Sequence, residues 1–152
     1  MKDRKSARRG SKGMISVRAN LEMWLKDLEY TMNKAKKQVE LEQYDTAAFY
    51  IHLAVEKALK AAIVALKNDE PPRVHNLVQL HVKIADNVVL LDKQIRFLRR
   101  LTTAAFETRY SDITLRLPDE IYTEKIVKNY LETAQQIINV ILAKIEGDKR
   151  DE

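Results

Sequence analysis

The stretch YDTAAFYIHLAVEKALKAAI, residues 44–63, is apolar on nearly every side of the helix that its residues favour. A helix on the surface of a soluble protein usually has one apolar stripe and a broad charged face. A helix that is apolar all round lies in the interior, or also contacts a second subunit. Its many alanines would let neighbouring helices approach closely. The sequence therefore predicts a central helix here, and homodimerisation through this helix or through the last one.

Apolar residues that recur at steps of three and four predict five helical segments. These segments span about 16–39, 45–66, 74–87, 92–108 and 119–146. The expected N-caps are Ser16, Asp45, Asp92 and Asp119, and Gly147 is the expected end of the last helix. Long helices joined by short connections pack as antiparallel neighbours. The predicted fold class is therefore all-α, an antiparallel up-and-down bundle of four to five helices.

The composition restricts the domain organisation and the compartment. The 152 residues suggest one domain, a bundle over 14–147 between a disordered basic tail at 1–13 and a frayed C-terminus at 148–152. The chain has no cysteine, which excludes disulfides and thiolate metal sites. No apolar run approaches the roughly 20 residues of a membrane span. We expect a cytoplasmic protein with no cofactor and no contact with a membrane.

A net charge of +5 would suggest nucleic-acid binding if it were spread over the folded domain, but it is not. Residues 1–13 hold six basic residues and one acidic residue, whereas the other 139 residues hold 21 of each. All of the excess therefore lies in the tail. The tail is either a solvated disordered segment or an arm that binds phosphate groups without specificity.

Three polar residues of the second segment, His52, Glu56 and Lys60, form a thin row at i, i+4 steps, apart from its other charged residues Asp45 and Lys57. Such a row is either a ladder on the helix surface, worth about 0.2–0.5 kcal/mol per pair, or the polar lining of a cleft between subunits. Both interpretations are open at this stage.

The other two histidines, His75 and His81, lie six residues apart and do not share a helix face as an i, i+4 pair would. No metal site is expected, because the ligand number and spacing are missing. After Pro71 and Pro72, either His75 or Asn76 can hydrogen-bond the exposed backbone at the start of a helix. The alternative is a catalytic or ligand-binding role for His75.

Arginines gather on one face of the fourth segment. Arg96, Arg99 and Arg100 recur at steps of three and four, and Arg109 follows the segment's end. Forked guanidinium groups in such a cluster can bind phosphate, or the cluster can be a solvated face paired with nearby carboxylates.

The irregular stretch 109–118 begins just after these arginines. Arg109 and Asp112 can form a salt bridge within the stretch, with Tyr110 as an anchor. The functional alternative is that all three form the rim of a binding site, because long loops often carry function.

Three segments in this order resemble the HEPN family, named for higher eukaryotes and prokaryotes nucleotide-binding domains. They are YDTAAFYIHLAVEKALKAAI at 44–63, PPRVHNLVQL at 71–80 and FETRYSD at 106–112, where Ser111 replaces the proline usual in that family. The resemblance implies a helical bundle that usually dimerises. It also implies a nucleotide ligand or a small nucleotidyltransferase-fold partner, in a pair that resembles a toxin–antitoxin module.

Some members of that family are metal-independent ribonucleases. In those members an arginine is followed after a short gap by a histidine, and two subunits build one cleft that cleaves RNA. In this sequence Arg73 and His81 leave seven residues between them, which is longer than the usual gap. Two functions follow from the resemblance: a non-catalytic or weakly active homodimer that binds a nucleotide or protein partner, or a ribonuclease with a displaced site at Arg73, His81 or His75. A third option is an assembly module without a ligand.

Overall fold

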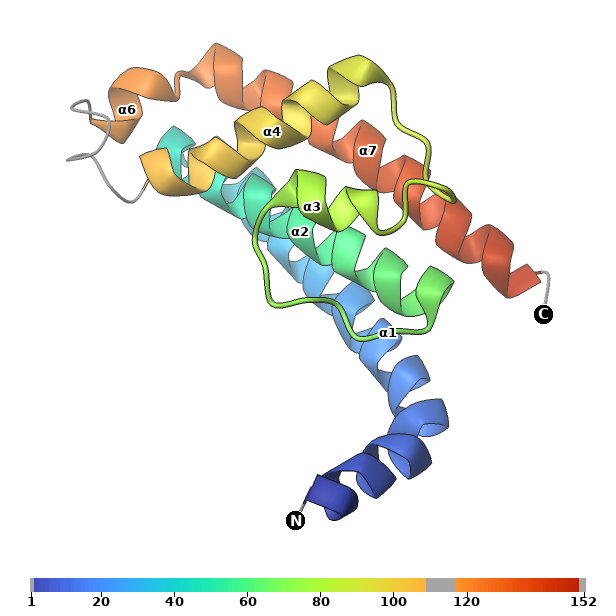
Figure 1. The fold of residues 1–152 in the computed structure, drawn as a ribbon. Helices are drawn as coiled ribbons and strands as arrows, with labels where there is room; N and C mark the ends of the chain where they lie inside the picture. Colours follow the sequence, from blue (N-terminus) through green and yellow to red (C-terminus); the bar gives the residue numbers. More distant parts are fainter. Residues whose placement is uncertain (1, 109–116, 151–152) are drawn as a thin grey trace.

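The computed structural model describes residues 2–108 and 117–150, and the side chains within residues 20–148 except those of 109–116 and 119. The helices are α1 (Lys2–Glu40), α2 (Tyr44–Lys67), α3 (Leu77–Val82), α4 (Asp92–Glu107), α6 (Pro118–Ile121) and α7 (Glu124–Arg150). The long helices α1, α2, α4 and α7 alternate in direction along the chain (Figure 1). The described residues contain no strand, and the predicted all-α antiparallel bundle is confirmed.

Helix α2 lies at the centre of the bundle, as its sequence predicts. It packs against α1, α3, α4, α6 and α7, and no residue from Tyr44 to Leu66 is exposed. Helix α2 therefore offers a second subunit little surface. Of the two helices predicted to carry a dimer interface, α7 retains an exposed side.

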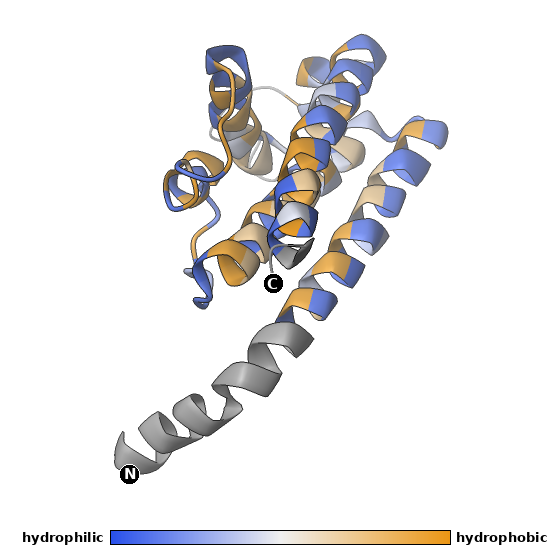
Figure 2. Ribbon diagram, turned by 90° about the vertical axis from the view of Figure 1, so that its right-hand side faces the viewer, coloured by the Kyte–Doolittle hydropathy of each residue, from blue (hydrophilic) through white to orange (hydrophobic). Residues whose placement is uncertain are grey.

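Small side chains allow α1 and α2 to pack closely. Ala35 of α1 and Ala47, Ala54 and Ala58 of α2 are fully buried. On α1 the apolar residues form a stripe that faces the bundle, and the opposite side is polar (Figure 2). The contrast between α1 and α2 follows from position, because an outer helix buries one face whereas the central helix buries all of them.

Several helix ends differ from those predicted. Helix α1 begins at Lys2, so Ser16 lies inside it and is not its cap; the predicted disorder of the tail stays a prediction. Helix α7 continues through Gly147 to Arg150, so Gly147 does not end it and residues 148–150 are helical. The third segment is helical only over Leu77–Val82; residues 74–76 are irregular, and turns replace the predicted helix over 83–87.

The predicted caps are partly correct. The side chain of Asn76 accepts hydrogen bonds from the backbone N–H groups of Val78 and Gln79, so Asn76 and not His75 caps α3. Asp45 lies within the first turn of α2, after the N-cap Gln43. Asp92 is the first residue of α4, whose N-terminus is closed instead by the Leu91 N–H donating to Gln94 Oε1 at 2.9 Å.

The last predicted helix is divided in two. The short α6 ends at Ile121, and α7 starts at Glu124, where Thr123 Oγ1 accepts from the Ile126 N–H at 3.4 Å. Between them Tyr122 turns inward and is 3% exposed. The break thus buries an aromatic ring that a continuous helix would place elsewhere.

The described part of the chain was also compared with two other features, a membrane-spanning helix and a cluster of metal ligands. Within the described residues no helix is long and apolar enough to cross a membrane. The same part of the chain contains no group of three or more His, Cys, Asp or Glu side chains that could hold a metal ion.

Candidate functional site

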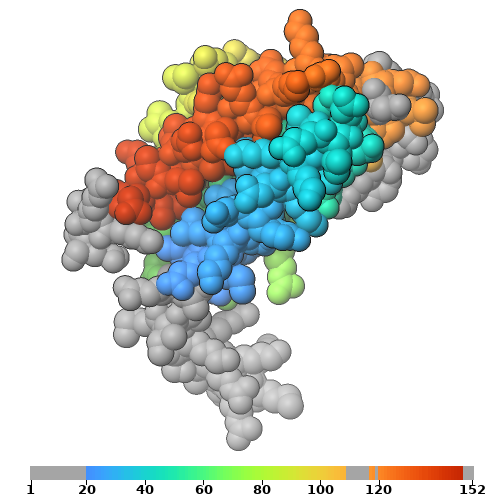
Figure 3. All heavy atoms as spheres, turned by 180° about the vertical axis from the view of Figure 1, so that it is seen from behind, coloured from blue at the N-terminus to red at the C-terminus, as the bar shows by residue number. Residues whose placement is uncertain are grey.

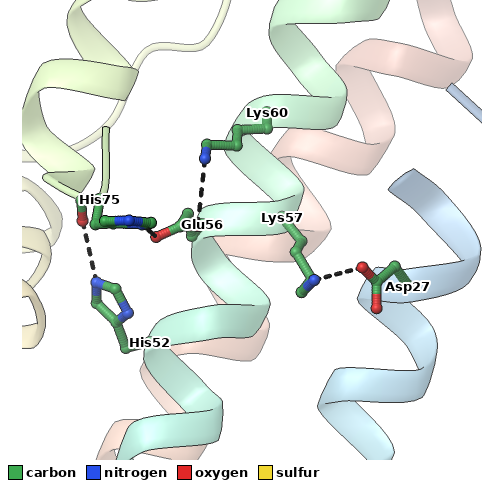
Figure 4. A network of polar contacts seen from close by, with 6 residues as sticks. All are labelled: Asp27, His52, Glu56, Lys57, Lys60 and His75. Carbon is green, nitrogen blue, oxygen red and sulfur yellow. Dashed lines mark hydrogen bonds and ion pairs between the residues drawn. The ribbon is translucent and has the colours of Figure 1, made fainter. Parts of the chain in front are cut away.

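The polar row of α2 is buried and bonds to the segment that follows the helix (Figure 4). His52, Glu56 and Lys60 are 2%, 6% and 7% exposed. Lys60 Nζ lies 3.4 Å from Glu56 Oε2, and His75 Nδ1 lies 3.0 Å from Glu56 Oε1. The interpretation as a ladder on the helix surface is therefore wrong, because these side chains face their own chain and not open solvent.

The chain after α2 is shaped so that it brings His75 over the row. Asn68 ends α2 in the left-handed conformation, with φ 52°, which asparagine tolerates better than most residues. Pro71 and Pro72 then keep the chain from continuing as a helix. His52 Nε2 donates to the backbone carbonyl of His75 at 3.1 Å, since a carbonyl can only accept. Both the backbone and the ring of His75 are therefore held by α2.

His75 itself remains accessible. Its side chain is 78% exposed, whereas that of Glu56 is 8% exposed. An ionised carboxylate only accepts hydrogen bonds, so Nδ1 of His75 carries the proton that Glu56 accepts. In the neutral ring Nε2 is then the basic nitrogen. This arrangement gives an exposed imidazole with a fixed tautomer, which is the usual preparation of a histidine for acid–base work.

A second polar contact connects the same region to α1. Lys57 Nζ forms an ion pair with Asp27 of α1 (Figure 4). The ring of Trp24 lies 6.0 Å from Lys57 Nζ and 5.8 Å from Lys60 Nζ, within the range of a cation–π contact. Local spacing gives no sign that Trp24 contacts Lys60 or that Asp27 pairs with Lys57, because these partners lie about 30 or more positions apart in the chain.

The structure separates the two residues of the candidate ribonuclease pair. His81 is 5% exposed, and its Nε2 donates to the Val88 carbonyl at 2.7 Å. This bond holds the turns between α3 and α4, whereas Arg73 is exposed. His81 thus has a structural position, and Arg73 and His75 are the exposed members of the predicted catalytic set.

Arg96, Arg99 and Arg100 are all exposed on α4, on the side opposite the buried Leu98 and Leu101. The predicted common face is therefore present. Within the described residues, none of the three guanidinium groups forms an ion pair with a carboxylate. The remaining members of this predicted anion site, Arg109, Tyr110 and Asp112, lie outside the described residues.

The buried Tyr130 adjoins the arginine face, and a second buried tyrosine, Tyr122, meets the ring of Tyr130 edge to face. Burial raises the pKa of Tyr130, and the neighbouring charge of Arg100 acts in the opposite direction. Tyr122 donates from its hydroxyl to Glu107 Oε2 at 2.7 Å, and burial, reinforced by this carboxylate, raises the pKa of Tyr122 well above its usual range. The Tyr130 ring meets Phe97 edge to face, with centroids 5.3 Å apart. Tyr122 and Glu107 were missed by the sequence analysis, because their contact depends on the break between α6 and α7.

The geometry defines an all-helical bundle with a histidine–carboxylate cluster on its central helix and an arginine face on α4. The chain belongs to the HEPN domain family, whose model matches residues 21–145, and this confirms the resemblance seen in the sequence.

Two solved structures share the fold. TT1696 from Thermus thermophilus has a TM-score of 0.72 and 22% sequence identity, over 82% of this chain and 97% of that one. ST0689, described as an archaeal HEPN homologue, has a TM-score of 0.66 at the same identity and the same coverage of both chains. A comparison with curated proteins gave no match. At this level of identity the likeness shows the fold alone.

Proposed function

We propose that this HEPN protein is a non-catalytic homodimeric module that binds a nucleotide through the arginine face of α4. The observation that carries the proposal is the exposure of Arg96, Arg99 and Arg100 on one side of a rigid helix, without a carboxylate partner among the described residues. Guanidinium groups bind phosphate oxygens through paired hydrogen bonds. Side chains three and four residues apart on a helix are neighbours, so they can bind the consecutive phosphates of one ligand.

The contact between Arg100 and Tyr130 supports the same proposal. A buried tyrosine beside an exposed arginine limits the conformations of the arginine. An arginine that is already ordered loses less side-chain entropy when it binds a ligand. Arg109 follows α4 closely in sequence, and we include Arg109, Tyr110 and Asp112 in the proposed site.

Nucleotide titration tests this proposal. The protein is mixed with ATP, GTP and inorganic triphosphate, and the melting temperature is followed, because a ligand that binds only the folded state raises it. We expect the shift to disappear in Arg96→Gln/Arg99→Gln. The matched control is Lys125→Gln/Lys144→Gln, which removes the same charge from exposed positions of α7. An equal shift in both double variants, or no shift in the unmodified protein, contradicts the proposal.

A nucleotidyltransferase-fold protein is the proposed partner, in a pair that resembles a toxin–antitoxin module. Membership of the HEPN family supports this proposal. Co-expression of this chain with a nucleotidyltransferase-fold protein encoded beside it, followed by size-exclusion chromatography, is the test. Separate elution of the two proteins at micromolar concentration argues against the pairing.

A second function, metal-independent cleavage of RNA, is favoured by one observation. His75 is exposed, and its tautomer is fixed by the buried Glu56. As a general base, His75 Nε2 would take the proton of a ribose 2′-OH, and that oxygen would attack the adjacent phosphorus. The bond from phosphorus to the 5′-oxygen then breaks, and a protonated group supplies the leaving oxygen with its proton. Arg73, two residues earlier on the same exposed segment, is the candidate for stabilising the phosphorane charge.

RNA cleavage in EDTA distinguishes the two functions. Single-stranded and structured RNAs are incubated with the unmodified protein, with His75→Ala and with Arg73→Ala. If the protein is a ribonuclease of this type, both substitutions abolish a cleavage that leaves a 2′,3′-cyclic phosphate, and Lys125→Ala does not. The absence of cleavage in the unmodified protein supports the binding module.

A further inference from the structure

A groove runs along the bundle between α1 and α7. These two helices lie side by side on one face of the molecule (Figure 3), and both pack on α2 behind them. The groove has a volume of about 450 Å³, and Leu25, Met32 and Leu142 are among the apolar residues that line it. Polar side chains of α1 form its rim, and Glu29, Asn33 and Lys36 of that rim are exposed.

The rim charges have a twofold pattern. Glu29 and Lys36 are seven residues apart, which is two helical turns, so they lie on one stripe of α1 at about 10.5 Å along the axis. This separation is too long for an ion pair between them, and within the described residues neither is paired with another charge. An antiparallel copy of α1, centred between Met32 and Asn33, would place Glu29 against Lys36 of the second copy and Lys36 against Glu29.

Such a stripe is complementary to itself, which is the requirement for an isologous dimer interface. A partner of different sequence would need the same two charges in reverse order at the same spacing, whereas a second copy supplies them automatically. The apolar residues on the floor of the groove would bury the surface that stabilises the dimer, because two ion pairs on an exposed rim contribute little.

We propose that the groove between α1 and α7 is the interface with a second copy of this chain, in which the two α1 helices cross antiparallel near Asn33. This inference rests on the homodimer in the proposed function and assigns its surface. The proposed interface contains α1 as well as α7, the last helix, through which the sequence predicts dimerisation. The arginine face of α4 lies outside this interface.

Charge exchange tests the assignment. The dissociation constant of the dimer is measured by analytical ultracentrifugation for Glu29→Lys, Lys36→Glu and the double variant. Each single change puts two like-charged pairs in the interface and should weaken the dimer about tenfold or more. The double variant recreates both pairs in reverse order and should restore most of the affinity. The exposed Lys37, which does not line the groove, provides the control Lys37→Glu, and its affinity should be unchanged.

Chemical cross-linking gives a second, independent measurement. Because the chain has no cysteine, Asn33→Cys introduces a single thiol close to the proposed twofold axis. A short bis-maleimide should join two copies of Asn33→Cys. It should not join two copies of Met23→Cys, whose side chain is 67% exposed in the unmodified protein but lies about 14 Å along α1 from the axis.

The outcomes separate this surface from the homodimer itself. A dimer that ignores the single charge changes and does not cross-link at Asn33→Cys overturns the groove assignment and leaves the homodimer intact. A protein that is monomeric at micromolar concentration overturns both. Nucleotide binding at α4 is measured separately and does not affect either result.

Discussion

Glu56 Oε1 of the central helix lies 3.0 Å from Nδ1 of His75, a residue 19 positions further along the chain. One member of this pair is buried and the other is exposed. The contact connects the interior of the bundle to its surface, because Glu56 is also the partner of the buried Lys60. A carboxylate with two such partners has a structural role as well as a role in orienting the imidazole.

We predict that Glu56→Ala is strongly destabilising. It leaves the ammonium group of Lys60, whose side chain is 9% exposed, without its carboxylate, and breaking a buried pair from one side costs about 3–5 kcal/mol. Glu56→Leu/Lys60→Met removes both charges and should recover most of that loss. Urea unfolding measures the three free energies. If the double variant is less stable than Glu56→Ala, the pair contributes more than the cost of burying it, and the prediction is wrong.

Substitution by alanine should affect stability differently at His75 and at His81. His75→Ala removes an exposed ring and should lower the free energy of unfolding by less than about 1 kcal/mol. His81→Ala removes a buried donor and leaves the Val88 carbonyl without its bond, which costs about 1–3 kcal/mol. Chemical denaturation of both variants checks this order. A larger loss in His75→Ala would show that its segment, and not the turn at Val88, is the more important support for the fold.

The arrangement of the helices could be predicted from the sequence because apolar periodicity is a local property. The same reasoning did not decide whether the row of His52, Glu56 and Lys60 is buried, since i, i+4 spacing is identical on a buried and an exposed face. The sequence did contain an indication that the row is buried. A helix predicted to be surrounded on all sides cannot keep one edge on the surface, so its polar residues also needed buried partners.

The partners of the row could not be predicted for a different reason. His75 and Trp24 reach it from other parts of the chain, and Asp27 reaches the neighbouring Lys57; the positions of all three depend on how the segment after α2 and helix α1 pack. The exact helix ends were also hard to predict, because several neighbouring residues can each cap the same helix. Gln43 and Leu91, rather than the aspartates, are the N-caps of α2 and α4, and the side chain of Gln94 accepts from the Leu91 N–H.

Gly147 offers a direct test of the longer α7. In this structure Gly147 lies within the helix, its φ is not positive, and a Cβ added to it would meet no atom within 4 Å beyond its chain neighbours and the adjacent helix backbone. Gly147→Ala should therefore stabilise the protein by about 0.5–1 kcal/mol. If Gly147 ended the helix in a left-handed conformation, as the sequence suggests, the same substitution would destabilise it. The sign of the change in urea unfolding decides, with Asp148→Ala as the neighbouring control.

Tyr122 predicts a dependence of stability on alkaline pH. Burial, assisted by the carboxylate of Glu107, raises the pKa of Tyr122 in the folded protein, whereas in the unfolded chain it is about 10. Below that value both states hold the proton, and the contribution of Tyr122 is fully present. As the pH rises further, the unfolded state loses the proton while the folded state keeps it, so stability falls.

Tyr122→Phe should remove this part of the alkaline loss. The variant is expected to be less stable at neutral pH by about 1.5–3 kcal/mol, because the hydrogen bond to a charged Glu107 is lost. Above about pH 10 its free energy of unfolding should decline less steeply than that of the unmodified protein. Denaturation at a series of pH values measures both effects, and Tyr30→Phe, at a position 61% exposed, is the control. Parallel pH profiles for the unmodified protein and Tyr122→Phe would contradict the prediction. They would mean that the pKa of Tyr122 is the same in the folded and the unfolded protein, and that neither burial nor the bond to Glu107 raises it.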